Sequence, residues 1–240
     1  MQNTLLVIII MLFTFQPSKP ETFEPITVLE LFTSQGCSSC PKADELLGNV
    51  KNKSNRVVAL SYHVDYWNYI GWNDPFSNKY NTEKQREYGE KFYSSRIYTP
   101  QLVINGREHF VGSNSRTLND KLEAYEKLKA KNSVTLSNIK QINKMINFNY
   151  SINGSIKDKK IRFILVIDER ITKVKRGENR NRVIKNENIV VNEIIETIED
   201  AEGEISIEIP KIVEQQDNLR IVAIIQTKTL DITGATQKTL

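Results

Sequence analysis

The chain has 240 residues, and its 33 Lys and Arg against 29 Asp and Glu give a formal net charge of +4. The basic residues are spread along the sequence and form no block, so the composition gives no support to nucleic-acid binding. The length allows one large domain or two small ones. The 2 cysteines belong to one motif, which fits a protein that passes through an oxidising compartment without spare thiols.

The N-terminal segment predicts export. Thr4–Phe15 is continuously apolar, about a dozen residues, which suits a signal peptide and is shorter than the ~20 residues of a membrane helix. No Lys or Arg precedes the run, and no small-x-small cleavage pattern follows it. We expect a periplasmic or secreted protein with a leader over residues 1–20 and no stable membrane span. An uncleaved N-terminal anchor is the alternative.

A Cys-x-x-Cys motif follows the first predicted strand. That strand is Val28–Phe32, and the helix that begins at the motif is expected to end near Gly48. A thiol at a helix N-terminus lies beside free backbone N–H groups and the positive end of the helix dipole, and both favour the thiolate. We therefore predict Cys37 as the attacking sulfur and Cys40, further in and less exposed, as the resolving sulfur.

Two structural interpretations of the cysteine pair stand beside this one. A closed zinc site would need two more ligands, and the chain offers only His63 and His109 besides the 2 cysteines. A purely structural disulfide is the stronger alternative, although so small a loop restricts the unfolded chain little.

The segment after the helix completes a β–α–β unit. Val57–His63 is predicted to be a buried parallel strand, and Val64–Phe76 after it holds both tryptophans. Loops at the carboxyl ends of parallel strands carry the sites of α/β folds, and this loop leaves the sheet at the same edge as Cys37. Trp67 and Trp72 are therefore candidate partner-binding residues, with a loop packed on the core as the alternative.

His63 ends this strand and has Asp65 as its nearest acid in the sequence. Asp65 is the candidate to orient His63 or to move a proton during thiol exchange, whereas a structural histidine is the alternative. Cys37, Cys40 and His63 would also make a soft two-sulfur, one-nitrogen site for Cu(I). Copper is the cofactor only under this alternative, since the redox hypothesis needs no cofactor.

The next elements complete a recognisable order. A helix is predicted over Asn78–Ser95, followed by Thr99-Pro100 directly before a short strand, an Asn105-Gly106 hairpin turn and a helix over Ser115–Lys129. The order β–α–β, helix, proline, β-hairpin, helix is typical of the thioredoxin fold, in which the proline is cis and faces the dithiol. We therefore predict a cis Thr99–Pro100 bond.

From residue 134 the sequence alternates and is rich in β-branched residues. The predicted strands are Val134–Ile139, Met145–Ile152, Ile161–Ile167, Ile189–Ile198, Ile205–Ile209 and Leu219–Gln226. They predict an antiparallel sandwich or curled sheet of about seven strands. The predicted fold class is an α/β thioredoxin-like domain, residues 24–131, followed by an all-β, antiparallel sandwich-like domain, residues 133–240.

Four phrases of the sequence resemble a known family. They are ELFTSQGCSSCP (Glu30–Pro41), HVDYWNYIGWNDPF (His63–Phe76), YTPQLVING (Tyr98–Gly106) and RGENRNR (Arg176–Arg182). Together they resemble the exported, thioredoxin-like bacterial family catalogued as domain of unknown function 1223, over nearly the whole mature chain. The resemblance implies a fold and an export route, and it implies no substrate.

The resemblance also draws attention to the arginine-rich segment. It suggests that this segment reaches the redox groove or an anionic partner, and guanidinium groups bind carboxylates bidentately. Arg176 and Arg180 are therefore candidate partner-binding residues, with a solvated loop between strands as the alternative.

The sequence favours an exported thiol–disulfide oxidoreductase. Cys37 would form a mixed disulfide with protein thiols or disulfides of the cell envelope, Cys40 would resolve it, and Thr99 and Pro100 would hold the partner in an extended form. A copper-handling module and a binding protein with a non-catalytic disulfide are the alternatives.

Overall fold

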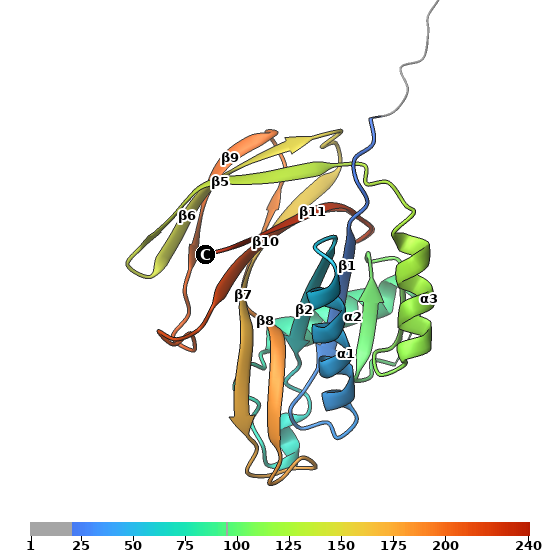
Figure 1. The fold of residues 1–240 in the computed structure, drawn as a ribbon, viewed down its shortest axis with the longest axis vertical. Coiled ribbons are helices and arrows are strands. Elements are labelled where there is room, and N and C mark those ends of the chain that lie inside the picture. Colours follow the sequence, from blue (N-terminus) through green and yellow to red (C-terminus); the bar gives the residue numbers. More distant parts are fainter. Residues whose placement is uncertain (1–20, 95) are drawn as a thin grey trace, which may run out of the picture.

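The computed structural model describes residues 21–94 and 96–240 (Figure 1). The predicted leader, residues 1–20, lies outside the described residues. Within the described ranges, no helix combines the length and the apolar character that crossing a membrane requires.

The described residues form eleven strands, three α-helices and one short 3₁₀ helix. The strands are β1 (Thr27–Thr33), β2 (Val57–His63), β3 (Gln101–Ile104), β4 (Glu108–Val111), β5 (Ser133–Ile142), β6 (Met145–Asn153), β7 (Lys159–Lys173), β8 (Val183–Thr197), β9 (Glu202–Glu208), β10 (Leu219–Thr227) and β11 (Ile232–Thr239). The helices are α1 (Cys40–Lys53), α2 (Lys79–Lys91), α3 (Ser115–Tyr125) and the 3₁₀ helix η1 (Asn68–Ile70).

Eight strands form one mixed sheet in the order β11-β10-β7-β8-β2-β1-β3-β4. Strands β1 and β2 are parallel, with Thr33 opposite His63 at their carboxyl ends. Strand β8 runs parallel to β2 on its other side, and the remaining neighbours are antiparallel. Strands β5, β6 and β9 form a second sheet, which lies beside β7, β10 and β11 in Figure 1.

The predicted fold class is wrong. A thioredoxin-like α/β domain followed by a separate all-β domain requires a separate sheet in each half, but β8 pairs with β2, and β7, β10 and β11 continue the same sheet. The protein is instead mostly β, with few helices. The reason is the open edge of β2: all seven of its residues are buried, so its unpaired backbone groups need a neighbouring strand. Sequence pattern identifies strands but does not say which distant strands pair.

Alternation along β1 divides the hydrophobic core between the two faces of the sheet. Leu29 and Leu31 face α1 and α3, where they pack with Leu47 of α1. Val28 and Phe32 face α2 on the other side. Because Thr33 and its neighbour His63 continue these alternations, their side chains belong to the face covered by α1.

A buried charged cluster lies on the α2 face. The Arg162 guanidinium of β7 is fully buried and contacts Glu30 Oε1 of β1 and Glu193 Oε1 of β8, each at 2.6 Å. Lys84 Nζ of α2 lies 3.0 Å from the same Glu193 oxygen. Burial by itself would raise the pKa of Glu193, but the positive charges of Arg162 and Lys84 outweigh it and lower that pKa. The cluster therefore holds two ion pairs that join the two halves of the chain.

Candidate functional site

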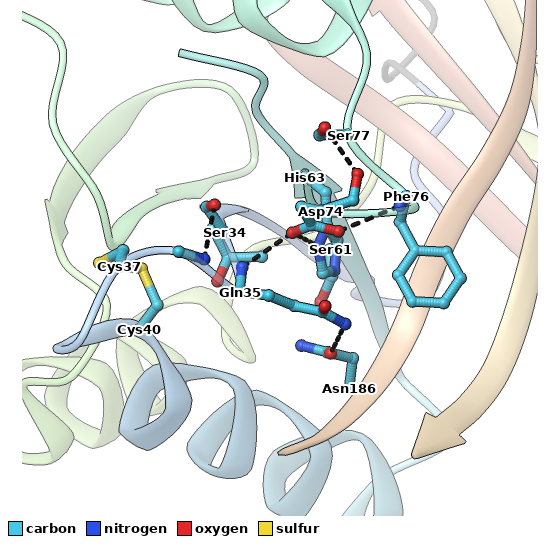
Figure 2. Close-up of polar contacts among 12 residues, drawn as sticks. Ser34, Gln35, Cys37, Cys40, Ser61, His63, Asp74, Phe76, Ser77 and Asn186 are labelled. Atoms are coloured by element: carbon cyan, nitrogen blue, oxygen red, sulfur yellow. Dashed lines mark hydrogen bonds and ion pairs between the residues drawn. A yellow bond between two sulfur atoms is a disulfide. The ribbon is translucent and has the colours of Figure 1, made fainter. Parts of the chain in front are cut away.

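Cys37 and Cys40 form a disulfide in the turn between β1 and α1, with Cα atoms 5.5 Å apart (Figure 2). Helix α1 begins at Cys40, with Ser39 as its N-cap residue and Pro41 in the first turn. The helix therefore starts later than the sequence analysis expected, since proline suits a first helical position. Both cysteines are buried, at 1% and 0% exposure, whereas Cys37 was predicted to be the more exposed.

The predicted proline lies beside the disulfide. The Thr99–Pro100 peptide is cis, as the sequence predicts, and Cys37 Sγ lies 3.9 Å from Thr99 O. The Ser39 hydroxyl oxygen lies 3.3 Å from the same sulfur. Because a disulfide sulfur has no proton, Ser39 is the donor in that contact. The structure thus brings together the predicted Cys37, Cys40, Thr99 and Pro100.

The aromatic segment, Val64–Phe76, packs over the cysteine turn. Trp67 Nε1 donates to Thr99 Oγ1 at 2.7 Å, and Trp72 Nε1 donates to Gln35 Oε1 at 3.1 Å. Space around Gly36 is tight, because a Cβ there would lie 3.2 Å from the Trp67 Cβ. Both indole N–H groups are therefore used within the chain, and partner binding by these tryptophans stays a prediction.

A second segment, residues 174–182 between β7 and β8, covers the site from another side, and we call it the β7–β8 cap. Its Asn179 is fully buried and donates through Nδ2 to Gln35 O and Cys37 O, both at 2.9 Å. Glu178 Oε2 accepts the backbone N–H of Ser38 at 2.9 Å. In Figure 1 the tip of the β7–β8 hairpin lies at the same end of the molecule as the β1–α1 turn.

The arginines of the cap have a different position. Arg176 and Arg180, the candidates from the sequence, are exposed, and their neighbours Glu178 and Asn179 make the contacts to the cysteine turn. Arg182 Nη1 donates to Asn179 Oδ1 at 3.0 Å, which fixes the orientation of that amide. The arginine-rich segment therefore reaches the site through the Asn179 amide and the Glu178 carboxylate. Anion binding by Arg176 and Arg180 stays a prediction.

His63 is fully buried behind the turn, and Gln35 lies between it and the disulfide in Figure 2. His63 Nδ1 lies 2.6 Å from Asp74 Oδ2, which also accepts the backbone N–H of Gln35 at 2.8 Å. Asp65, the predicted partner of His63, instead accepts a hydrogen bond from Thr82 Oγ1 at 2.5 Å. Asp74 therefore takes the position that the sequence analysis gave to Asp65.

Asp44 lies on α1, four residues after Cys40, and is 2% exposed. Its Oδ2 accepts a hydrogen bond from Thr33 Oγ1 at 3.0 Å, whereas its Oδ1 has no hydrogen-bond partner among the described residues. His63 Nε2 is likewise buried without a partner there. Burial raises the pKa of Asp44 to about 7, although nearby His63 opposes the shift. Burial alone would lower the pKa of His63, but Asp74 and Asp44 outweigh it and raise that pKa.

The copper alternative requires the two sulfurs and His63 to gather around one point. Within residues 21–94 and 96–240, no group of three or more His, Cys, Asp or Glu side chains is arranged to hold a metal ion. Cys37 and Cys40 are bonded to each other, and His63 binds Asp74. The structure does not assemble the three predicted ligands.

The sequence analysis missed Asp44, Asp74 and Asn179. Asp44 had a signal, because residues four apart on a helix share a face, so a carboxyl at this spacing from Cys40 lies near it. Asp74 approaches His63 only because the chain turns back after η1 and Gly71, which has a φ of 88°. Asn179 is 142 positions from Cys37, and nothing in the local sequence links them.

The comparison with family models identifies the family of this chain. Residues 28–226 match the family model described as protein of unknown function (DUF1223). The crystal structure of protein AGR_C_4864 from Agrobacterium tumefaciens is 28% identical over 92% of this chain and 95% of that one, with a TM-score of 0.66. A DUF3823 family protein from Bacteroides ovatus is only remotely similar, at 12% identity over 45% of this chain and 51% of that one, with a TM-score of 0.30. No curated protein matches the chain. The chain belongs to the DUF1223 family.

Proposed function

We propose that the protein is a thiol–disulfide oxidoreductase acting through Cys37 and Cys40. The observation that carries the proposal is the set of titratable groups, Asp44, His63 and Asp74, buried behind the disulfide. A disulfide across two intervening residues contributes little stability through the unfolded chain. Buried carboxyl and imidazole groups are themselves costly, and strongly perturbed titratable groups gather at functional sites.

The positions of the two sulfurs support their different roles. Ser38 and Ser39 beside Cys37 are exposed. When the aromatic segment and the β7–β8 cap move away, a partner therefore meets Cys37 first, because Cys40 lies behind it at the start of α1. The Ser39 hydroxyl can donate to a Cys37 thiolate and so stabilise it. Cys37 then attacks a partner disulfide, and Cys40 attacks Cys37 in the resulting mixed disulfide and releases the partner as a thiol.

Because the disulfide is buried, access of a partner to Cys37 controls the reaction. The Trp67 side chain holds the aromatic segment against Thr99, and the Asn179 side chain holds the β7–β8 cap against the cysteine turn. A partner must displace these contacts to reach Cys37 Sγ. The described conformation is therefore a closed one, and partner binding is coupled to opening.

Export belongs to the same proposal. The apolar Thr4–Phe15 run supports it, and a persistent disulfide suits an oxidising compartment. The partners are then protein thiols and disulfides of the cell envelope.

Trapping tests the function. The variant Cys40→Ser retains the attacking sulfur but cannot resolve, so we expect it to accumulate mixed disulfides with glutathione disulfide in vitro and with cell-envelope proteins in the producing cell. The matched control Cys37→Ser keeps only the inner sulfur and should form adducts far more slowly. Mass analysis before and after reduction measures both.

One outcome would overturn the proposal. If Cys40→Ser forms adducts no faster than Cys37→Ser, and the wild-type disulfide resists dithiothreitol while the protein stays folded, the pair is structural.

A further inference from the structure

We propose that the β7–β8 cap binds an acidic polypeptide segment of the redox partner, and that carboxylates of this segment release the cap from the cysteine turn by drawing Arg182 away from Asn179. The inference rests on the proposed oxidoreductase function, because it names the class of partner and the way in which that partner reaches Cys37. It gives the arginines of the cap a role in access to the disulfide.

The cap presents three arginines at the end of the molecule where the β1–α1 turn lies (Figure 1). Arg176, Arg180 and Arg182 are exposed, and none of them forms an ion pair with another described residue. Glu178 is the one acid among residues 174–182, and its carboxylate already accepts the Ser38 N–H. Because guanidinium groups bind carboxylates bidentately, this surface fits a segment that carries several Asp or Glu residues.

Exposed apolar side chains border the arginines. Val183, directly after the cap, is 67% exposed, and Ile171 on the same face of the β7–β8 hairpin is 64% exposed. Tyr69 is 82% exposed and belongs to the aromatic segment, whose Ile70 packs against Gly177 of the cap. A polypeptide offers both carboxylates and apolar side chains to such a surface. It also brings the thiol or disulfide that Cys37 requires, which an anionic lipid surface does not.

Arg182 connects this surface to the disulfide. Its Nη1 donates to Asn179 Oδ1 at 3.0 Å, and Nδ2 of the same amide donates to Gln35 O and Cys37 O, both at 2.9 Å. Asn179 is fully buried, so water does not readily replace Arg182 as the donor to Oδ1. A carboxylate that binds Arg182 therefore leaves a buried acceptor unpaired and makes the closed cap less stable.

Glu178 adds a second preference for an acidic partner. Hydrogen bonds from Ser38 lower the pKa of Glu178, so a carboxylate lies on the Ser38 N–H at neutral pH. Further carboxylates bound to the neighbouring arginines repel it and favour movement of the cap away from the turn. The Ser38 N–H can then donate to a partner carboxylate instead. An acidic segment thus binds the open cap more tightly than the closed one, which is the condition for a ligand to open it.

The test measures binding and disulfide reduction with one defined probe. The probe is a labelled, cysteine-free peptide in which Glu and Ser alternate, and matched peptides carry Gln or Lys in place of Glu. Fluorescence anisotropy gives the affinity for the oxidised full chain, and thiol alkylation gives the rate of reduction by dithiothreitol. We expect the Glu peptide to bind, more weakly as salt is added, and at saturation to raise the reduction rate about tenfold, while the Gln and Lys peptides do neither.

Variants of the arginines separate binding from release. Arg182→Met should be reduced about tenfold faster than wild type without peptide, and the Glu peptide should then change its rate by less than about twofold. Arg176→Met/Arg180→Met should bind the peptide about fivefold more weakly and still respond at saturation. The matched control is Lys140→Met, an exposed position on β5 far from the hairpin tip in Figure 1, which should bind and respond as wild type. Circular dichroism checks the fold of each variant.

Several results would overturn the inference. Binding of the Glu peptide without faster reduction is one, and equal responses of Arg182→Met and Lys140→Met are another. Faster reduction on vesicles that contain phosphatidylglycerol, without a response to the Glu peptide, would assign the surface to a membrane and overturn it as well. Because the reductant is dithiothreitol, these results do not depend on the proposed function. That function would fail separately, if Cys40→Ser formed no mixed disulfides.

Discussion

Individual residues differ in how far the sequence reveals their role. The closeness of Cys37 to Cys40 and the cis Thr99–Pro100 peptide were predictable because each belongs to a short motif, whereas the redox roles of the two sulfurs stay predictions. The partner of His63 was not predictable, since Asp65 is nearer in the sequence, but Asp74 is brought back by a turn. Residues that approach through loops carry no local signal.

Arg162 shows the same limit and leads to a prediction about stability. Its guanidinium is fully buried and contacts Glu30 and Glu193. The sequence pattern of β7 predicts only an ordinary core strand. Replacement Arg162→Met leaves two buried carboxylates with Lys84 as the remaining cation of the cluster. We expect the free energy of unfolding to fall by about 3–5 kcal/mol, measured by urea denaturation with the disulfide intact.

The control for this prediction is an exposed ion pair. Arg86 lies 3.1 Å from Glu83 on the surface of α2, and Arg86→Met should change the free energy of unfolding by less than about 1 kcal/mol. Equal effects of the two substitutions would show that the buried cluster has no special weight in stability.

At the scale of elements, the sequence predicted most helices and strands, together with the parallel β1–β2 pair and the β3–β4 hairpin, but it missed the pairing of β2 with β8. The six alternating runs after residue 134 correspond to β5 to β10, while β11 was missed because Gly234 and its polar C-terminal half weaken the pattern. Helix α1 begins at Cys40 because Pro41 suits its first turn. The pairing of β8 with β2 depends on which buried edge needs a strand, and that is decided only when the whole chain is folded.

The β7–β8 cap is the element whose contribution can be measured. Its Asn179 donates two hydrogen bonds to the cysteine turn, and each contributes about 1 kcal/mol. Asn179→Ala should therefore raise the population of open cap, and the rate of disulfide reduction by dithiothreitol, by about 10- to 30-fold. Thiol alkylation over time gives the rate, and hydrogen exchange of residues 174–182 reports opening.

Lys175→Ala is the matched control, because Lys175 is exposed in the same cap. It should keep the wild-type rate. Reduction of Asn179→Ala at the wild-type rate would mean that the cap does not limit access to Cys37.

At the scale of the whole molecule, one sheet unites the two halves of the sequence. The two halves differ in sequence pattern, and the sequence analysis therefore separated them into two domains. A strand pairing and a buried ion cluster nevertheless cross the expected boundary. The site depends on this union, because the β1–α1 turn and the first residue of α1 supply the sulfurs, while the β7–β8 hairpin supplies the cap that covers them. A fold with two independent domains would leave the disulfide without that cover.

The central claim is that this covered disulfide is a working redox couple, and a redox titration of the folded wild-type chain tests it most directly. The protein is equilibrated in glutathione buffers of graded potential, and its thiols are counted by alkylation and mass. We predict that Cys37 and Cys40 convert together as a two-electron couple with a midpoint above about −300 mV, while the circular dichroism of the fold is unchanged. A pair that stays oxidised until the protein unfolds would contradict the account.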